Sequence, residues 1–97
     1  MSRFDQAKML LKMRKLQKEL EHQVITVERG DGAVIVEMSG DQKLKKIKLN
    51  PEMIDTDDVS QLERWLEEAV RAAIQESQKV AAEKMQPMMG AFGNLGL

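Results

Sequence analysis

The chain has 97 residues, enough for one domain, and its 15 basic and 16 acidic residues leave a formal net charge of −1. It contains no cysteine, which excludes disulfides and thiolate metal sites and fits a reducing compartment such as the cytoplasm. The hydrophobic share of 42% predicts a folded protein, and we expect neither a signal peptide nor a membrane partner.

Residues 4–22 predict a first helix, because they lack Gly and Pro and are rich in good helix formers. Four apolar residues recur at helical spacing and form a stripe that needs a partner surface: Met9, Met13, Leu16 and Leu20. The basic residues lie on the far side of this stripe or near it: Lys8, Lys12, Arg14, Lys15 and Lys18. Phe4, Ala7 and Leu11 form a second apolar island among these basic positions.

Three short strands are predicted next, at residues 23–29, 33–39 and 44–49. The turn Gly30-Asp31-Gly32 supplies the positive φ values of a tight hairpin, and Gly40-Asp41 makes the next turn. Pro51 ends the third strand. The two short loops imply an antiparallel three-stranded meander.

Residues 56–86 predict a second, long helix, with Asp55 or Thr56 as its N-cap and Pro87 as its end. Residues 88–97 contain three glycines and are expected to form a flexible tail. The whole chain, residues 1–97, is therefore predicted to be a single α-β-β-β-α domain of the α+β class.

The length of the second helix predicts a homodimer. About 30 residues make a helix of about 45 Å, whereas a compact monomer of this size has a radius of gyration of only about 12–13 Å. A second copy would cover the overhanging apolar stripe and the open sheet edges; the alternative is a helix that simply protrudes. The expected interface residues lie on the second helix: Leu62, Trp65, Leu66, Ala69 and Ile74.

No residue pattern predicts catalysis, and we expect no cofactor, no metal and no small-molecule substrate. The single histidine, His22, has no catalytic partner in a recognisable pattern. Gly30-Asp31-Gly32 lacks the glycines and the strand-to-helix setting of a phosphate loop. Asp55, Asp57 and Asp58 do not have the spacing of a calcium loop and fit helix capping better.

Two basic features are candidate DNA contacts. Residues 1–18 hold six basic residues and one acid, a net charge of +5, and a second cluster comprises Lys43, Lys45, Lys46 and Lys48. The alternatives are an ordinary solvated helix face for the first and protection of an edge strand for the second. Because no base-reading module is present, any duplex binding is expected to depend on phosphate charge and DNA shape.

Several short motifs, taken together in order, carry a family resemblance. They are the Met/Lys/Gln-rich segment Ala7–Leu20, the turn Gly30–Val34, Gly40, the strand and Asn-Pro end Leu44–Pro51, Asp58-Val59, Leu62-Glu63, Glu68–Val70 and Ala73, followed by a Gly-rich end. This order resembles the YbaB/EbfC family of bacterial nucleoid-associated proteins over nearly the whole chain. The chain departs from the usual family pattern at Asn50 and Arg71.

The resemblance implies a homodimer with protruding helices that binds double-stranded DNA in the nucleoid and contributes to nucleoid organisation and gene expression. It also implies DNA contacts on the terminal helices, which correspond here to Lys8, Lys12, Lys15, Lys18, Lys79 and Lys84. The alternative hypothesis is a cytosolic protein-interaction adaptor for recombination or replication proteins. Such an adaptor would use the Phe4/Leu11 island or the Met-rich C-terminus.

Overall fold

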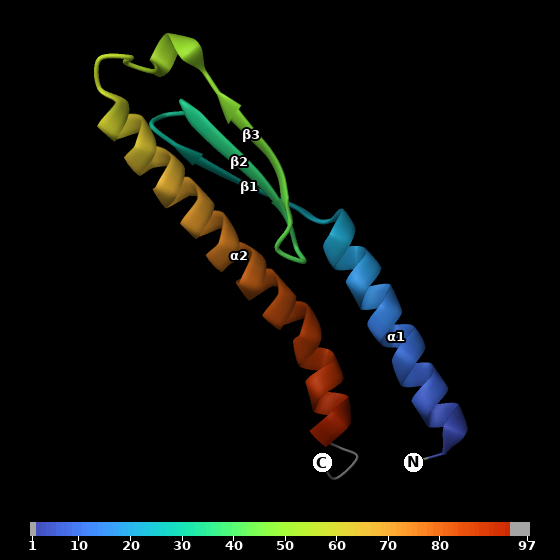
Figure 1. Cartoon of the computed structure of the whole chain (residues 1–97). Coiled ribbons are helices and arrows are strands. Elements are labelled where there is room, and N and C mark those ends of the chain that lie inside the picture. Colours follow the sequence, from blue (N-terminus) through green and yellow to red (C-terminus); the bar gives the residue numbers. More distant parts are fainter. Residues whose placement is uncertain (1, 94–97) are drawn as a thin grey trace.

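A computed structural model describes residues 2–93 and the side chains of residues 2–88. The elements follow the order α1 (Arg3–His22), β1 (Val24–Arg29), β2 (Val34–Ser39), β3 (Leu44–Leu49), a short 3-10 turn η1 (Pro51–Met53) and α2 (Val59–Gly93). Figure 1 shows the two helices running side by side away from one end of the sheet. The predicted α+β class and the α-β-β-β-α order are confirmed.

The three strands form one antiparallel sheet in the order β1-β2-β3, as predicted. In register, Val36 of β2 lies opposite Val27 of β1 on one side and Ile47 of β3 on the other. The hairpin between β1 and β2 turns through Gly30 and Gly32, whose φ angles are +65° and +95°. These left-handed conformations explain why glycine stands at both positions.

The core lies between α2 and one face of the sheet. Val34, Val36 and Met38 of β2 are buried there. They pack against Ala69 and Ala73 of α2, whose small side chains allow the helix to approach the sheet closely. Hydrophobic burial of this kind is the main favourable term in folding.

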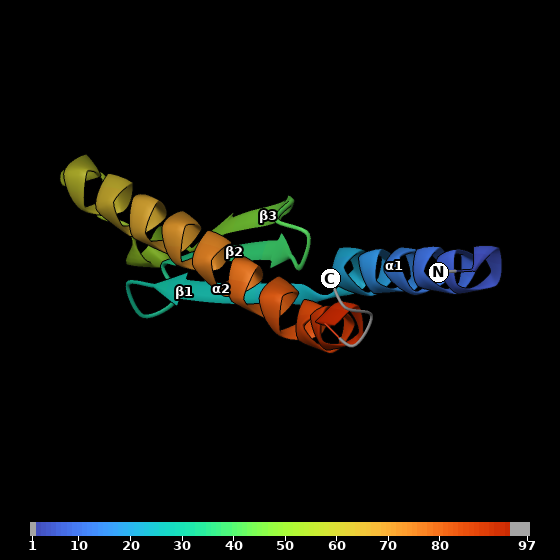
Figure 2. The same ribbon diagram turned by 90° about the horizontal axis from the view of Figure 1, so that it is seen from below.

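One edge of the core face is left open. Leu44, Ile47 and Leu49 of β3 pair with Met38, Val36 and Val34, so they point to the same face of the sheet. They remain 54%, 40% and 46% exposed, respectively. The reason is that α2 packs on β1 and β2 and does not reach β3. Figure 2 shows α2 crossing the sheet diagonally, seen from below.

The molecule is elongated, because α1 and the second half of α2 extend beyond the sheet (Figure 1). Its radius of gyration is 18.7 Å and its principal extents are 64 × 20 × 15 Å. The C-terminal end of α1 is anchored at the β2–β3 turn, where the N–H of Gly40 donates to the carbonyls of Leu20 (2.8 Å) and Gln23 (3.0 Å). A Cβ atom at Gly40 would lie 2.9 Å from the Leu20 carbonyl oxygen, so a side chain would push the helix away.

Helix α2 begins later than predicted, at Val59 and not at residue 56. The prediction of Asp55 or Thr56 as the cap is wrong, because the carboxylate of Asp58 accepts the N–H of Gln61 (3.2 Å). The carboxylate of Asp55 instead accepts the N–H of Asp57 (2.9 Å) within the preceding turn. Small differences of one residue also separate the predicted and observed starts of α1, β1 and β2.

The prediction that Pro87 ends α2 is also wrong, because the helix continues to Gly93. Proline removes one backbone hydrogen bond, but its φ is compatible with a helix. The helix here runs beside α1, and Met88 contributes to a shared apolar groove just after the proline. Residues 88–93 of the expected flexible tail are therefore helical, and residues 94–97 lie outside the described part of the chain.

Candidate nucleic-acid interface

One face of α1 is turned towards α2. Of the predicted apolar stripe, Leu20 is buried, Met9 and Leu16 are half-buried, and Met13 is 51% exposed. Burial is therefore greatest at the C-terminal end of α1, where Gly40 anchors the helix. The partner surface that the stripe required is the same chain's α2, but the two helices contact each other loosely.

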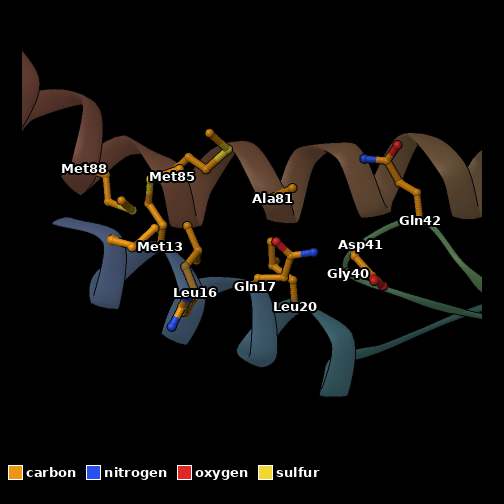
Figure 3. A pocket seen from close by; sticks show the side chains of 12 residues that line it. Met13, Leu16, Gln17, Leu20, Gly40, Asp41, Gln42, Ala81, Met85 and Met88 are labelled. Carbon is orange, nitrogen blue, oxygen red and sulfur yellow. The ribbon is translucent and has the colours of Figure 1, made fainter. Parts of the chain in front are cut away.

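A groove of about 470 Å³ separates the two helices. Its walls are mostly apolar side chains from both helices, and the β2–β3 turn closes one end; the lining includes Leu16 and Leu20 of α1, Ala81, Met85 and Met88 of α2, and Gly40–Gln42. Figure 3 shows Met13 and Leu16 pointing from α1 towards α2. The groove therefore accounts for the apolar side of α1.

The opposite face of α1 is cationic. Four exposed lysines lie within an arc of about 120° at 100° per residue, namely Lys8, Lys12, Lys15 and Lys18. In the part of the chain that the structure describes, no carboxylate lies within 4.0 Å of these four ammonium groups. Lys8 Nζ instead lies 4.7 Å from the centre of the Phe4 ring. The four charges are thus available to an anionic partner.

The other predicted basic residues have different surroundings. Arg14 is exposed at the rim of the groove. Lys79 is exposed on α2. Lys84 of α2 pairs with Glu19 of α1 at 3.7 Å, so part of its charge is used to join the two helices. The structure therefore groups Lys8, Lys12, Arg14, Lys15 and Lys18 on one helix and separates Lys79 and Lys84 from them.

Comparison with known proteins assigns the sequence to a family. The sequence matches the profile of the YbaB/EbfC DNA-binding family over residues 2–92. The chain belongs to this family.

Relatives in several bacteria support the family assignment. A nucleoid-associated protein of Chloroflexus aurantiacus is 36% identical over 83 residues, which cover 86% of this chain and 83% of that protein. A nucleoid-associated protein of Ruminiclostridium cellulolyticum is 34% identical over 88 residues, covering 91% and 76%. The crystal structure of an uncharacterised Helicobacter pylori protein has the same fold, with a TM-score of 0.77, 16% identity and coverage of 86% and 87%.

In this YbaB/EbfC protein the second lysine cluster, on β3 and the turn before it, is partly neutralised. Lys43 pairs with Asp41 and Lys48 pairs with Glu37, both at 3.4 Å. The hydrogen bond from Ser39, followed by the interactions with Lys43, lowers the pKa of the Asp41 carboxyl. The cluster therefore fits the alternative interpretation, a protected edge strand, better than a DNA contact.

The predicted interface residues lie mostly in the chain's own core. Leu62, Trp65 and Leu66 pack against the buried cluster, and Ala69 is fully buried within it, which leaves Ala69 no surface for a partner. Ile74 is 38% exposed. It lines a shallow groove between α2 and β3, together with Ile47, Leu66 and Val70.

The open row Leu44, Ile47 and Leu49 was not among the predicted interface residues. Its signal was present in the sequence, since these apolar residues are interspersed with lysines along β3. What the sequence did not show is that α2 would leave this edge of the core face uncovered.

The structure adds three findings, on metal sites, on membrane spans and on the single histidine. Within the described residues, no three His, Cys, Asp or Glu side chains are placed to hold a metal ion. Neither helix, over the described part of the chain, has a stretch that is both long and apolar enough to cross a bilayer. His22 lies at the C-terminal end of α1 and is exposed.

Proposed function

We propose that this protein is a nucleoid-associated protein that binds double-stranded DNA through the cationic face of α1. The observation that carries the proposal is the set of four exposed lysines on a protruding helix, with no carboxylate within 4.0 Å of their ammonium groups in the described structure. Lysines that contact phosphates release condensed counterions, which supplies a large part of DNA affinity. The family membership and the names of the relatives support the same assignment.

The proposed binding has little sequence selectivity, because lysine ammonium groups recognise phosphates and carry no base code. A protein of this kind would be found in the cytoplasm on the nucleoid and would contribute to nucleoid organisation and gene regulation. No catalytic step is assigned to it.

The test is a titration of duplex DNA at several salt concentrations. Replacing Lys8, Lys12 and Lys15 together by Ala should weaken binding and reduce the slope of log K against log salt by about 0.9 for each phosphate that the variant no longer neutralises. The control removes the same charge from the second cluster, with Lys43, Lys45 and Lys46 changed to Ala, and should retain most of the affinity. Equal reductions of affinity in the two triple variants would reject the assignment to α1. No binding of the unmodified protein at low salt would instead favour the adaptor hypothesis.

We further propose that the active species is a homodimer. The accessible surface of the chain is 7129 Å², whereas a compact monomer of this size exposes about 5,600 Å². The excess of about 1,500 Å² exceeds the roughly 800 Å² that each partner buries in a stable interface. The apolar row of β3 and the groove beside Ile74 are the surface that a second copy would cover.

The dimer proposal is tested by placing a charge in the β3 row. Ile47→Asp should convert the dimer into a monomer in sedimentation at micromolar concentration, because an unpaired carboxylate would be buried in the interface. Val24→Asp is the matched control: Val24 is a β-branched residue that is 58% exposed on the opposite edge strand. A monomeric unmodified protein, or an unchanged dimer in Ile47→Asp, would contradict the proposed interface.

A further inference from the structure

The cationic face of α1 contains an apolar strip that nothing in the described chain covers. Phe4 is 68% exposed and Leu11 is 63% exposed, and Ala7 lies between them and is also exposed. None of the three lines the groove against α2. Exposed apolar residues are common singly, but here a large aromatic and a large aliphatic side chain lie on one helix face, which makes this face a candidate interaction surface.

Basic residues lie on both sides of this strip. At 100° per residue, Phe4 and Ala7 lie within about 40° of Leu11 around the helix axis. Cations flank the strip on both sides; Lys8 and Lys15 lie about 40–60° to one side of Leu11, and Arg3 and Arg14 lie about 60–80° to the other. From Phe4 to Leu11 the surface is therefore an apolar centre between two basic margins, and the strip ends at Lys18, which lies about 20° from Leu11 around the axis.

This pattern matches the cross-section of a DNA major groove. The groove is about 12 Å wide and admits one α-helix, which has a diameter of about 10–12 Å with its side chains. A phosphate backbone borders the groove on each side, and the floor displays the base edges. The exposed apolar group on that floor is the C5-methyl of thymine.

We propose that α1 enters the major groove with Phe4 and Leu11 against thymine methyl groups, while its two basic margins contact the two phosphate backbones. The inference rests on the proposed DNA binding and adds which groove is occupied and which base feature is favoured. It yields a mild preference for thymine-containing sequences without hydrogen bonds to bases. The Lys8 ammonium above the Phe4 ring, at 4.7 Å from its centre, fits a side-chain pair directed at the same polyanion.

The charges on α1 favour a polyanion as the occupant of this face, with apolar groups lying between its two charged edges. A second copy of this chain would bring its own basic margins against those of the first, since each margin carries two cations close to the strip. Two such faces repel each other in direct contact. The strip is also distinct from the β3 row, which lies on the sheet.

The test compares two duplexes that differ only in one base. One duplex contains thymine, and in the other every thymine is replaced by uracil. Uracil lacks only the C5-methyl, so base pairing and every hydrogen-bonding group of the groove are retained. The full-length protein should bind the thymine duplex more tightly, by about fourfold for each methyl group contacted. A third duplex, rich in G·C pairs, should gain affinity when its cytosines are replaced by 5-methylcytosine, which puts a methyl at the same groove position.

Variants identify the side chains responsible. The double variant Phe4→Ala, Leu11→Ala should bind thymine and uracil duplexes equally while keeping its salt dependence. It is expected to fold, because both residues are exposed and Ala favours helix. Leu10→Ala is the matched control: Leu10 is 50% exposed but lines the groove against α2, so this variant should keep the thymine preference.

The outcomes separate this inference from the proposed function. Salt-dependent binding with equal affinity for thymine and uracil duplexes would overturn the inference and leave DNA binding intact. Absence of binding to either duplex would reject the proposed function itself. Loss of the dimer in the double variant would assign the strip to a second copy. Binding of the unmodified protein to vesicles of anionic lipid, with no preference between the duplexes, would assign the strip to a membrane surface. Both the loss of the dimer and this vesicle binding would overturn the inference.

Discussion

The turn between β1 and β2 offers a sharp test of how Trp65 is held on the sheet. A Cβ atom at Gly30 would lie 2.8 Å from the ring of Trp65, and the φ of Gly30 is +65°. Gly32 in the same turn has a φ of +95°, and a Cβ there would have no neighbour within 4 Å. Gly30→Ala and Gly32→Ala therefore differ chiefly in the clash with the tryptophan.

The expected loss of stability follows from three contributions. A left-handed conformation costs an alanine about 1–2 kcal/mol, and the reduced freedom of the unfolded chain returns about 0.4–1 kcal/mol. The overlap with Trp65 adds about 1–3 kcal/mol, as for other overpacked side chains. The unfolding free energy of Gly30→Ala should thus fall by about 3 kcal/mol, within a range of about 1–5 kcal/mol. The central value lowers Tm by roughly 12–24 °C for a domain of this size. Gly32→Ala should lose about 1 kcal/mol.

Urea unfolding at one fixed protein concentration measures both losses. Trp65 is the only tryptophan, so its fluorescence reports directly on its packing against the turn, and far-ultraviolet circular dichroism follows the helices in parallel. The φ of Gly32 lies further from the left-handed minimum, so its backbone cost is at least as large as that of Gly30. A greater loss at Gly30 can then come only from the tryptophan. Equal losses in the two variants would refute the packing of Trp65 on this turn.

Two further predictions concern the β2–β3 turn. Ser77→Ala should lower the unfolding free energy by about 1 kcal/mol in urea titrations, because the buried Ser77 hydroxyl donates to the Ser39 carbonyl at 2.8 Å; an unchanged midpoint would show that this bond does not stabilise the fold. The hydrogen bond from Ser39, and then Lys43, lowers the pKa of Asp41 below its ordinary value of 3.8. The carboxylate therefore stabilises the fold above pH 3.8, and this stabilisation is lost as the pH falls through the lower pKa of the folded state. Unfolding measured between pH 5 and pH 2 should lose this part of its pH dependence in Asp41→Asn, and identical pH profiles would contradict the assignment.

Much of the fold could be predicted because local signals and the global structure agree. The Gly30-Asp31-Gly32 turn specified the first hairpin, and the β3 range of residues 44–49 was predicted without error. The ends of α2 were not, since capping was possible at several neighbouring acids and only the structure shows that Asp58 receives the bond. The effect of Pro87 was overestimated, because the sequence does not show that α1 lies beside the helix at that point.

For the candidate site, too, the features set by local sequence were predicted and those set by tertiary packing were not. The sequence placed Lys8, Lys12 and Lys15 on one helix face, which follows from helical periodicity alone. Lys84 was grouped with them, but its pairing with Glu19 depends on how the two helices approach, which no local pattern records. The DNA contacts themselves remain predictions.

The anchoring of α1 at Gly40 has a mechanical consequence. The C-terminal end of the helix is fixed by two hydrogen bonds, and the groove separates much of the rest of it from α2, so a change of angle at this anchor would move the whole helix. A helix of 20 residues is about 30 Å long. A tilt of about 10° at the anchor therefore moves its free end by about 5 Å. Repacking beside Leu20 would therefore shift the position of the basic residues near the free end of α1.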